Sequence, residues 1–184
     1  MSIKVLAMVG SLRKGSYNKL ALRAAMELKP MGMEIEVGEI GDLPLYNDDV
    51  REAGYPAPVQ RLREQVRAAD ALLFVTPEYN YSVPGVLKNA IDWCSRPPDQ
   101  PLDGKPAAIM GASTGRLGTA RAQYHLRQIC VFVNVLPVNR PEVMLAGAAK
   151  LFDAEGRLND ESTRKFIGDL LVSLENWTTR LKAK

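Results

Sequence analysis

Residues 10–18 carry a combination of side chains that could bind a phosphate group. Ser11, Ser16 and Asn18 can each hydrogen-bond to phosphate oxygens. Arg13 adds a fixed positive charge, and the glycines on either side of it let backbone N–H groups turn towards a ligand. The segment therefore has the composition of a phosphate-binding loop. The alternative is an ordinary strand-to-helix turn in which Ser16 or Asn18 caps the helix.

Two well-known phosphate loops do not fit this segment. Gly10 and Gly15 have the glycine spacing of a Walker A loop, but Ser16 stands where that loop requires lysine. The GxGxxG fingerprint of dinucleotide-binding folds is also missing from the sequence. Neither phosphoryl transfer from ATP nor classical dinucleotide binding is therefore indicated.

Residues 77–85 form a second segment that could face a ligand. Two prolines stiffen it, two tyrosines offer planar surfaces, and Asn80 offers both donors and an acceptor. A rigid, flat loop of this kind suits the edge of a planar heterocycle. The alternative is that Tyr79 and Tyr81 are half-buried packing residues and Asn80 only forms a turn.

Residues 111–118 form the third segment. Its three glycines permit close approach of the backbone to a ligand, and Ser113 and Thr114 are available donors. This signal is weak when it stands alone, because glycines after strands are common. It gains weight only if the three segments lie together in the fold.

Hydrophobic periodicity predicts the elements that position these segments. Short apolar runs indicate buried strands at residues 3–9, 33–37, 71–75, 107–110 and 142–145. Helical stripes cover residues 18–28, 59–69, 84–94, 120–131 and a long C-terminal stretch that includes 166–181. A loop rich in Gly, Pro and Asp spans residues 42–58.

This alternation predicts one α/β domain over residues 1–184, with a parallel sheet covered by helices on both faces. For five strands we expect a flavodoxin-like, doubly wound five-stranded sheet in the order 2-1-3-4-5. In such sheets ligands bind beyond the carboxyl ends of the strands, where the strand order reverses. The three segments follow the first, third and fourth predicted strands, so we expect them to meet there.

Composition narrows the class of protein further. The 184 residues include 46% hydrophobic and 24% charged residues with a net charge of +3, which excludes a disordered chain. No apolar run approaches the roughly 20 residues of a membrane helix, and no secretory leader is apparent, so we expect a cytoplasmic protein. Cys94 and Cys130 are predicted to be core thiols, without a disulfide or metal site. Arg61, Arg63 and Arg67 are predicted to form a solvated helix face, so no nucleic-acid partner is indicated.

The remaining candidate groups are isolated. Asp48 and Asp49 have no third metal ligand nearby and are interpreted as solvated turn residues. His125, the only histidine, lies in the middle of a predicted helix, which favours a surface or subunit-interface position over a catalytic one. Arg96 is the candidate substrate-binding residue, because a guanidinium at the mouth of the cleft would attract NADPH phosphates or an oxyanion acceptor. The alternative is that Arg96 caps the end of the preceding helix.

Three strings in the sequence carry a resemblance to a known family. They are GSLRKGSYN at residues 10–18, PEYNYSVPGVLKNAIDW at residues 77–93 and GRLGTARAQ at residues 115–123. Together they resemble the NADPH-dependent FMN reductase family, which includes bacterial quinone reductases also described as chromate and azo-dye reductases. The resemblance covers most of the chain, and the string at residues 77–93 is the most specific.

The resemblance implies a tightly held FMN with three groups of binding residues. The phosphate would be held by Ser11, Arg13, Ser16 and Asn18. The isoalloxazine would be flanked by Pro77, Glu78, Tyr79 and Asn80, and its other edge closed by Ser113, Gly115 and Gly118. No catalytic side chain is implied, because the chemistry would take place at flavin N5.

The function predicted in this way is FMN-dependent reduction of quinones by NADPH or NADH. Other small acceptors, namely chromate, azo dyes and free flavin, are also expected, in a ping-pong reaction. The resemblance further implies a homodimer or homotetramer. One alternative is an electron carrier of the flavodoxin type, against which the positive net charge argues. A non-catalytic regulatory or scaffold protein of the same fold is the other.

Overall fold

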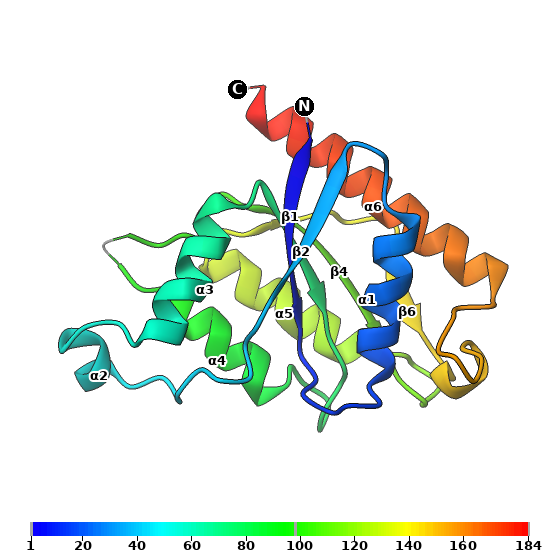
Figure 1. The fold of residues 1–184 in the computed structure, drawn as a ribbon, viewed down its shortest axis with the longest axis horizontal. Helices are drawn as coiled ribbons and strands as arrows, with labels where there is room; N and C mark the ends of the chain where they lie inside the picture. The colour runs from blue at the N-terminus through cyan, green and yellow to red at the C-terminus, as the bar shows by residue number, and fades with distance from the viewer. Residues whose placement is uncertain (1, 98, 184) are drawn as a thin grey trace.

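The computed structural model describes residues 2–97 and 99–183, in which strands and helices alternate (Figure 1). The strands are β1 (Ile3–Val9), β2 (Met33–Gly38), β3 (Ala71–Val75), β4 (Pro106–Ala112), β5 (Leu136–Pro137) and β6 (Val143–Leu145). The helices are α1 (Tyr17–Leu28), α2 (Asp48–Glu52), α3 (Ala57–Ala68), α4 (Gly85–Cys94), α5 (Ala120–Phe132) and α6 (Glu161–Lys182), with a 3-10 turn η1 (Ala148–Lys150).

The strands form one parallel sheet in the order β2-β1-β3-β4-β5, with β6 also beside β4. This order confirms the predicted flavodoxin-like, doubly wound arrangement. In Figure 1, α1 and α6 lie on the right of the sheet and α3 and α4 on the left. The sheet is therefore the middle of three layers.

The residues of β1 explain why the sheet is covered on both faces. Val5 and Ala7 belong to the apolar cluster formed with α1 and α6, whereas Leu6 and Met8 belong to the cluster formed with α3, α4 and α5. Successive side chains of a strand point to opposite faces, so a continuously apolar strand needs helices on both sides. The apolar run of β1 thus places the sheet between two helical layers.

The structure contains one strand more than predicted, the two-residue strand β5. Leu136 and Pro137 of β5 pair with the first residues of β4, and Val143–Leu145 of β6 pair with the last three residues of β4. The prediction for residues 142–145 matches β6, but the expectation of five strands is wrong. A two-residue strand carries no periodicity from which it could have been detected.

A second difference lies in the predicted loop at residues 42–58. Asp48 and Asp49, interpreted as turn residues, begin the short helix α2. The Asn47 side chain accepts a hydrogen bond of 2.9 Å from the Asp49 N–H and caps the helix. The two carboxylates lie in the first turn, where the helix dipole favours negative charge. One turn of helix is too short to be predicted from apolar periodicity.

The three arginines of α3 do not share one environment. Arg61 forms a bidentate ion pair with Asp42, and Arg67 pairs with Asp99. Arg63 is buried instead, donates a hydrogen bond of 2.9 Å to the Trp93 carbonyl, and lies on the ring of Tyr55. The prediction of a solvated face is therefore wrong for Arg63. A guanidinium tolerates burial where carbonyl oxygens at a helix end accept hydrogen bonds from its N–H groups.

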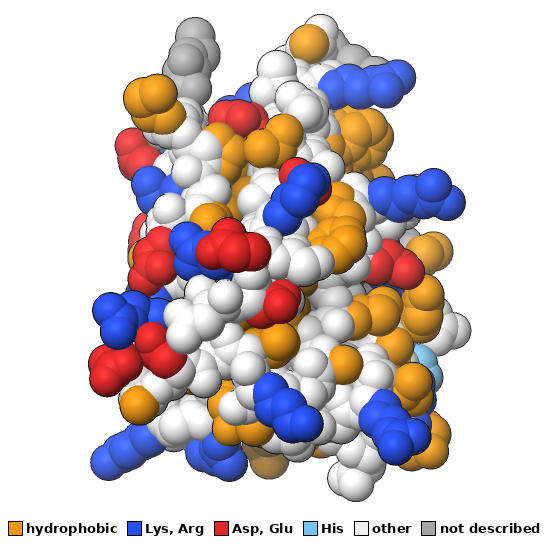
Figure 2. Space-filling view, turned by 90° about the vertical axis from the view of Figure 1, so that its right-hand side faces the viewer, with side chains coloured by type: hydrophobic (Ala, Val, Ile, Leu, Met, Phe, Trp, Pro, Cys, Tyr) orange, Lys and Arg blue, Asp and Glu red, His pale blue; other side chains and the backbone are white. Residues whose placement is uncertain are grey.

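The two cysteines are free and buried, as predicted. Burial raises the pKa of each thiol, Cys94 and Cys130, to about 12, so both remain protonated at neutral pH. Within the described residues, no helix has the length and apolar character needed to cross a bilayer, and no three potential metal ligands gather. On the face turned to the viewer in Figure 2, acidic and basic side chains are intermixed.

Candidate functional site

The three predicted segments meet at the carboxyl edge of the sheet, around a cavity of about 350 Å³. The cavity follows β1, β3 and β4 and so spans the point where the strand order reverses. Its lining includes eight predicted site residues: Ser11, Arg13, Ser16, Asn18, Pro77, Glu78, Tyr79 and Ser113. Three further residues line it: Tyr17, Ala112 and Thr114. The remaining predicted residues stand outside the lining: Asn80, Gly115, Gly118 and Arg96.

The first segment leads from β1 into the start of α1. The Ser16 hydroxyl accepts a hydrogen bond of 3.2 Å from the Asn18 N–H and caps α1, while Ser11 is buried in the lining. Arg13 donates to the Gly15 carbonyl at 2.5 Å and has no carboxylate partner among the described residues. An arginine without a counterion beside a helix N-terminus provides the positive potential that a phosphate needs.

Tyr17 was not predicted as a site residue, although it stands inside the first string. Its ring stacks on Phe152, with 6.0 Å between the centroids, and it also lines the cavity. The sequence signal that could have identified it is an aromatic residue directly after the N-cap of a phosphate loop.

The second segment is a tight hairpin. Tyr79 and Ser82 exchange two backbone hydrogen bonds of 3.1 and 3.0 Å around Asn80 and Tyr81. Asn80 and Tyr81 have φ values of 49° and 68°, which is the left-handed geometry of a type I′ turn. The turn makes the segment rigid, as predicted. Tyr79 and Tyr81 are exposed, so the alternative of half-buried packing residues is wrong for both.

The tip of this hairpin is attached to α5. The Arg121 guanidinium lies 3.6 Å from the centroid of the Tyr81 ring. The Ser82 hydroxyl lies 3.0 Å from Nδ1 of His125, which is exposed on the helix surface. The histidine thus contacts the hairpin and not the cavity.

Glu78 has a role that the sequence did not reveal. Its carboxylate accepts hydrogen bonds from the backbone N–H groups of Arg121 and Ala122 at 3.0 and 3.2 Å, and it pairs with the Arg121 side chain. Thr119, the N-cap residue of α5, makes no capping bond through its own side chain. The buried carboxylate of Glu78 therefore caps α5 from another segment, and it is not free to bind a ligand.

The third segment is anchored to β6 and the turn that follows it. The Ser113 N–H donates to the Leu145 carbonyl at 3.0 Å, and the Ser113 carbonyl accepts from the Ala148 N–H at 2.9 Å. The Gly147 N–H donates to the Gly115 carbonyl at 3.1 Å. The Ser113 hydroxyl accepts from the Gly115 N–H at 3.1 Å and closes a small turn. These bonds hold the segment at the edge of the cavity.

Gly118 lies against β6. Its φ is 58°, and a Cβ atom placed on it would come within 2.9 Å of the Met144 carbonyl carbon. Steric fit is therefore sufficient to require glycine at this position, whether or not a ligand is bound.

Arg96 lies at the far end of α4 from the second segment. Its Nε donates to the Asp92 carbonyl at 3.1 Å, its Nη2 donates to the Ser95 hydroxyl at 2.9 Å, and its guanidinium lies 5.1 Å from the Tyr46 ring centroid. The ten residues of α4 separate it from the hairpin by about 15 Å along the helix. This is the geometry of the helix-capping alternative.

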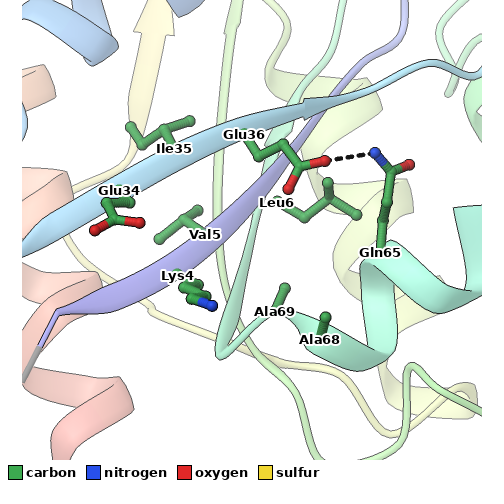
Figure 3. A pocket seen from close by; sticks show the side chains of 9 residues that line it. All are labelled: Lys4, Val5, Leu6, Glu34, Ile35, Glu36, Gln65, Ala68 and Ala69. Atoms are coloured by element: carbon green, nitrogen blue, oxygen red, sulfur yellow. Dashed lines mark hydrogen bonds between the residues drawn. The ribbon is translucent and has the colours of Figure 1, made fainter.

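A second hollow, of about 370 Å³, lies between β1, β2 and α3 (Figure 3). Within it Gln65 donates a hydrogen bond of 2.6 Å to Glu36, and Lys4 and Glu34 add charges of opposite sign. It contains none of the predicted site residues and lies beside the first half of β1. The cavity at the carboxyl edge is therefore the candidate functional site.

The fold and this cavity define the class of protein: a flavodoxin-like domain with a cavity between the three loops that follow β1, β3 and β4. The family model of the NADPH-dependent FMN reductases matches residues 3–150. The chain therefore belongs to the NADPH-dependent FMN reductase family.

Similar proteins cover nearly the whole chain. It is 62% identical over 180 residues to an NAD(P)H-dependent FMN reductase of Pseudomonas aeruginosa, covering 98% of this chain and 97% of the relative. It is 46% identical over 183 residues to a quinone reductase of Escherichia coli, with coverages of 98% and 97%. Among solved structures, the flavoenzyme FerB of Paracoccus denitrificans, an NAD(P)H:(acceptor) oxidoreductase, aligns with a TM-score of 0.90 and 39% identity, over 97% of this chain and 98% of that one.

The capping role of Glu78 yields a stability prediction. Glu78→Ala leaves two helix N–H groups and the Arg121 guanidinium without their acceptor, so the free energy of unfolding should fall by about 2–3 kcal/mol. Urea unfolding of the flavin-free protein measures this difference. Glu27→Ala, which removes a surface ion pair with Arg23, is the matched control and should cost about 0.5 kcal/mol or less. Equal losses for the two variants would contradict the capping role.

Proposed function

We propose that this protein is an FMN-dependent NAD(P)H oxidoreductase that reduces quinones and other small acceptors. The observation that carries the proposal is one cavity in which the loop at residues 10–18 faces the hairpin at residues 79–82. Arg13 of that loop has no carboxylate partner among the described residues. Membership of the NADPH-dependent FMN reductase family supports the same assignment. The relatives named quinone reductase support quinones as acceptors.

The residues present fit an FMN. Ser11, Arg13 and Ser16 would bind the phosphate at the N-terminus of α1, because hydroxyl groups, a guanidinium and helix N–H groups all suit a dianion. Tyr79 and its backbone neighbours would lie along the isoalloxazine. When bound, FMN supplies the capacity to accept a hydride and return two electrons, which amino-acid side chains lack.

The second loop would contribute Pro77, Glu78 and Asn80 through the backbone. The Glu78 carboxylate is committed to α5 and the Asn80 φ of 49° keeps the hairpin tight. At the other edge, Ser113 and Gly115 would border the ring system. The Ser113 N–H donates to the Leu145 carbonyl and the Gly115 N–H donates to the Ser113 hydroxyl, so these bonds would hold the segment in place beside the ring.

We further propose that NADPH and NADH both serve as donors and that chromate, azo dyes and free flavin are accepted besides quinones. The cavity is open to solvent and its lining places no charged side chain other than Arg13 and Glu78 beside the ligand. A site of this kind would impose few electrostatic requirements on an acceptor. We also propose the cytoplasm as the place where the protein acts.

An exposed apolar strip on α5 supports a homo-oligomer, a dimer or a tetramer. Tyr124, Val131 and Phe132 of this helix are exposed, Phe132 to 85%. Aromatic side chains of this kind are enriched in protein interfaces, and a lone domain gains nothing from exposing them. His125 belongs to the same helix, and the exposed Tyr81 packs against its Arg121.

Steady-state kinetics test the proposed activity. The purified protein should contain FMN. NADPH should bleach the absorbance of the oxidised flavin at about 450 nm, and a quinone should restore it. Double-reciprocal plots of NADPH against quinone should give parallel lines, because both substrates occupy one cavity in turn. A protein that binds no FMN, or intersecting lines without competition between the substrates, would contradict the proposal.

Arg13 is the residue whose removal most directly tests the phosphate site. Arg13→Ala should weaken FMN binding by about 1.5–3 kcal/mol, the range for a hydrogen bond to a charged group. Fluorescence titration of the flavin-free protein measures the dissociation constant. Arg116→Ala, which removes an exposed arginine of the third segment outside the cavity lining, is the control and should leave the constant unchanged. An unchanged constant in Arg13→Ala would place the phosphate elsewhere.

For Arg96 the geometry favours capping over substrate binding. Arg96→Ala should lower the free energy of unfolding by about 1 kcal/mol, because the Asp92 carbonyl loses one of its two side-chain donors and keeps only the Ser95 hydroxyl. The KM for NADPH, measured per flavin-loaded molecule of the same preparation, should not change. A raised KM with unaltered stability would instead support the substrate-binding role.

A further inference from the structure

We infer that Asn18 is a positioning residue that fixes the phosphate loop to the end of β4, and not a ligand of the phosphate. The inference rests on the proposed FMN site and assigns a different role to one of its residues. Asn18 is the second residue of α1 and is buried, with 3% of its surface exposed.

The Asn18 amide is held at both of its ends by one backbone residue. Its Oδ1 accepts a hydrogen bond of 2.9 Å from the Ala112 N–H, and its Nδ2 donates one of 2.9 Å to the Ala112 carbonyl. Ala112 lies 94 residues further along the chain, at the end of β4. The side chain thus makes the pair of bonds that a neighbouring strand would otherwise make.

The sheet explains why Ala112 needs this partner. On the β3 side the ladder ends with Val75 beside Met110, followed by one further bond from the Thr76 N–H to the Met110 carbonyl. The residue after Thr76 is Pro77, which has no N–H and begins the second segment. Without Asn18, Ala112 would be left with a buried N–H and a buried carbonyl unpaired, which is unfavourable because neither group could hydrogen-bond to water instead.

Asn18 therefore supplies the missing pairing from α1, and this joins two loops of the cavity. On one side of the joint, Ser16 and Asn18 begin α1, where the phosphate would bind. On the other side, Ala112 leads directly into Ser113, which borders the opposite edge of the cavity. Without the Asn18–Ala112 bonds, both edges of the cavity could move. The cavity would then fit the whole flavin less well, and not only its phosphate.

Comparison of FMN with riboflavin, which lacks the phosphate, tests this role. Asn18→Leu removes both hydrogen bonds with little change in size and adds no charge near the phosphate. We expect its dissociation constants for FMN and riboflavin to rise by the same factor, about tenfold, so that their ratio stays at the wild-type value. The measurement is made well below the melting temperature of each flavin-free protein. Asn18→Ser, a milder change, takes the place of Asn18→Leu if the latter does not fold.

Arg13→Ala is the matched control, because it should weaken FMN binding and leave riboflavin binding unchanged. If Asn18→Leu behaves in the same way, Asn18 is a phosphate ligand and the inference fails. The inference also fails if the melting temperature falls while both dissociation constants stay unchanged, because Asn18 then only stabilises the fold. A wild-type protein that binds neither flavin would overturn the proposed function itself, which separates that failure from the other two.

Discussion

The constraint on which the rest of the structure depends is the parallel pairing of β1 with both β2 and β3. Because β1 is the first strand but lies between its successors, the chain must leave β1 towards one face of the sheet and leave β3 towards the other. The α1 helix packs on one face and α4 on the opposite face. Their connecting loops separate at the carboxyl edge, and the cavity is the space between them.

A gap created in this way leaves polar backbone groups that need partners. Two side chains from distant segments supply them: Asn18 pairs with the end of β4, and Glu78 caps α5. Both residues belong to loops that border the cavity, yet the functional groups of both bind backbone groups of the protein itself. Residues that hold loops in place and residues that touch a ligand are therefore interleaved along the same short strings.

The sequence predicted the strands β1, β2, β3, β4 and β6, the long helices and the convergence of three loops, because each depends on local periodicity or on topological rules. It did not predict that Asn18 and Glu78 bind backbone groups, since their partners lie 94 and 43 residues away and leave no local signal. Arg63 was misjudged for the same reason, because its acceptor is the Trp93 carbonyl. Helical spacing describes which face a side chain is on, but not which distant atoms cover it.

The family resemblance and the structure give different information about the loops. The strings identify which residues occur together, and the geometry separates their roles: Arg13 has no carboxylate partner among the described residues, whereas Glu78 pairs with Arg121 and caps α5. Gly118 and Arg96 likewise have steric and helix-capping reasons for their identities. Membership of a family therefore indicates which residues make up a site, and the contacts within this chain indicate what each of those residues does.

The central claim is that the cavity between the loops after β1, β3 and β4 holds FMN, with its phosphate at the N-terminus of α1. A crystal structure of the protein with FMN bound tests this directly. The account predicts phosphate oxygens within hydrogen-bonding distance of Ser11, Arg13 and Ser16, with the Asn18 amide still bonded to Ala112. A phosphate bound at any other place, such as the hollow between β1, β2 and α3, would contradict it.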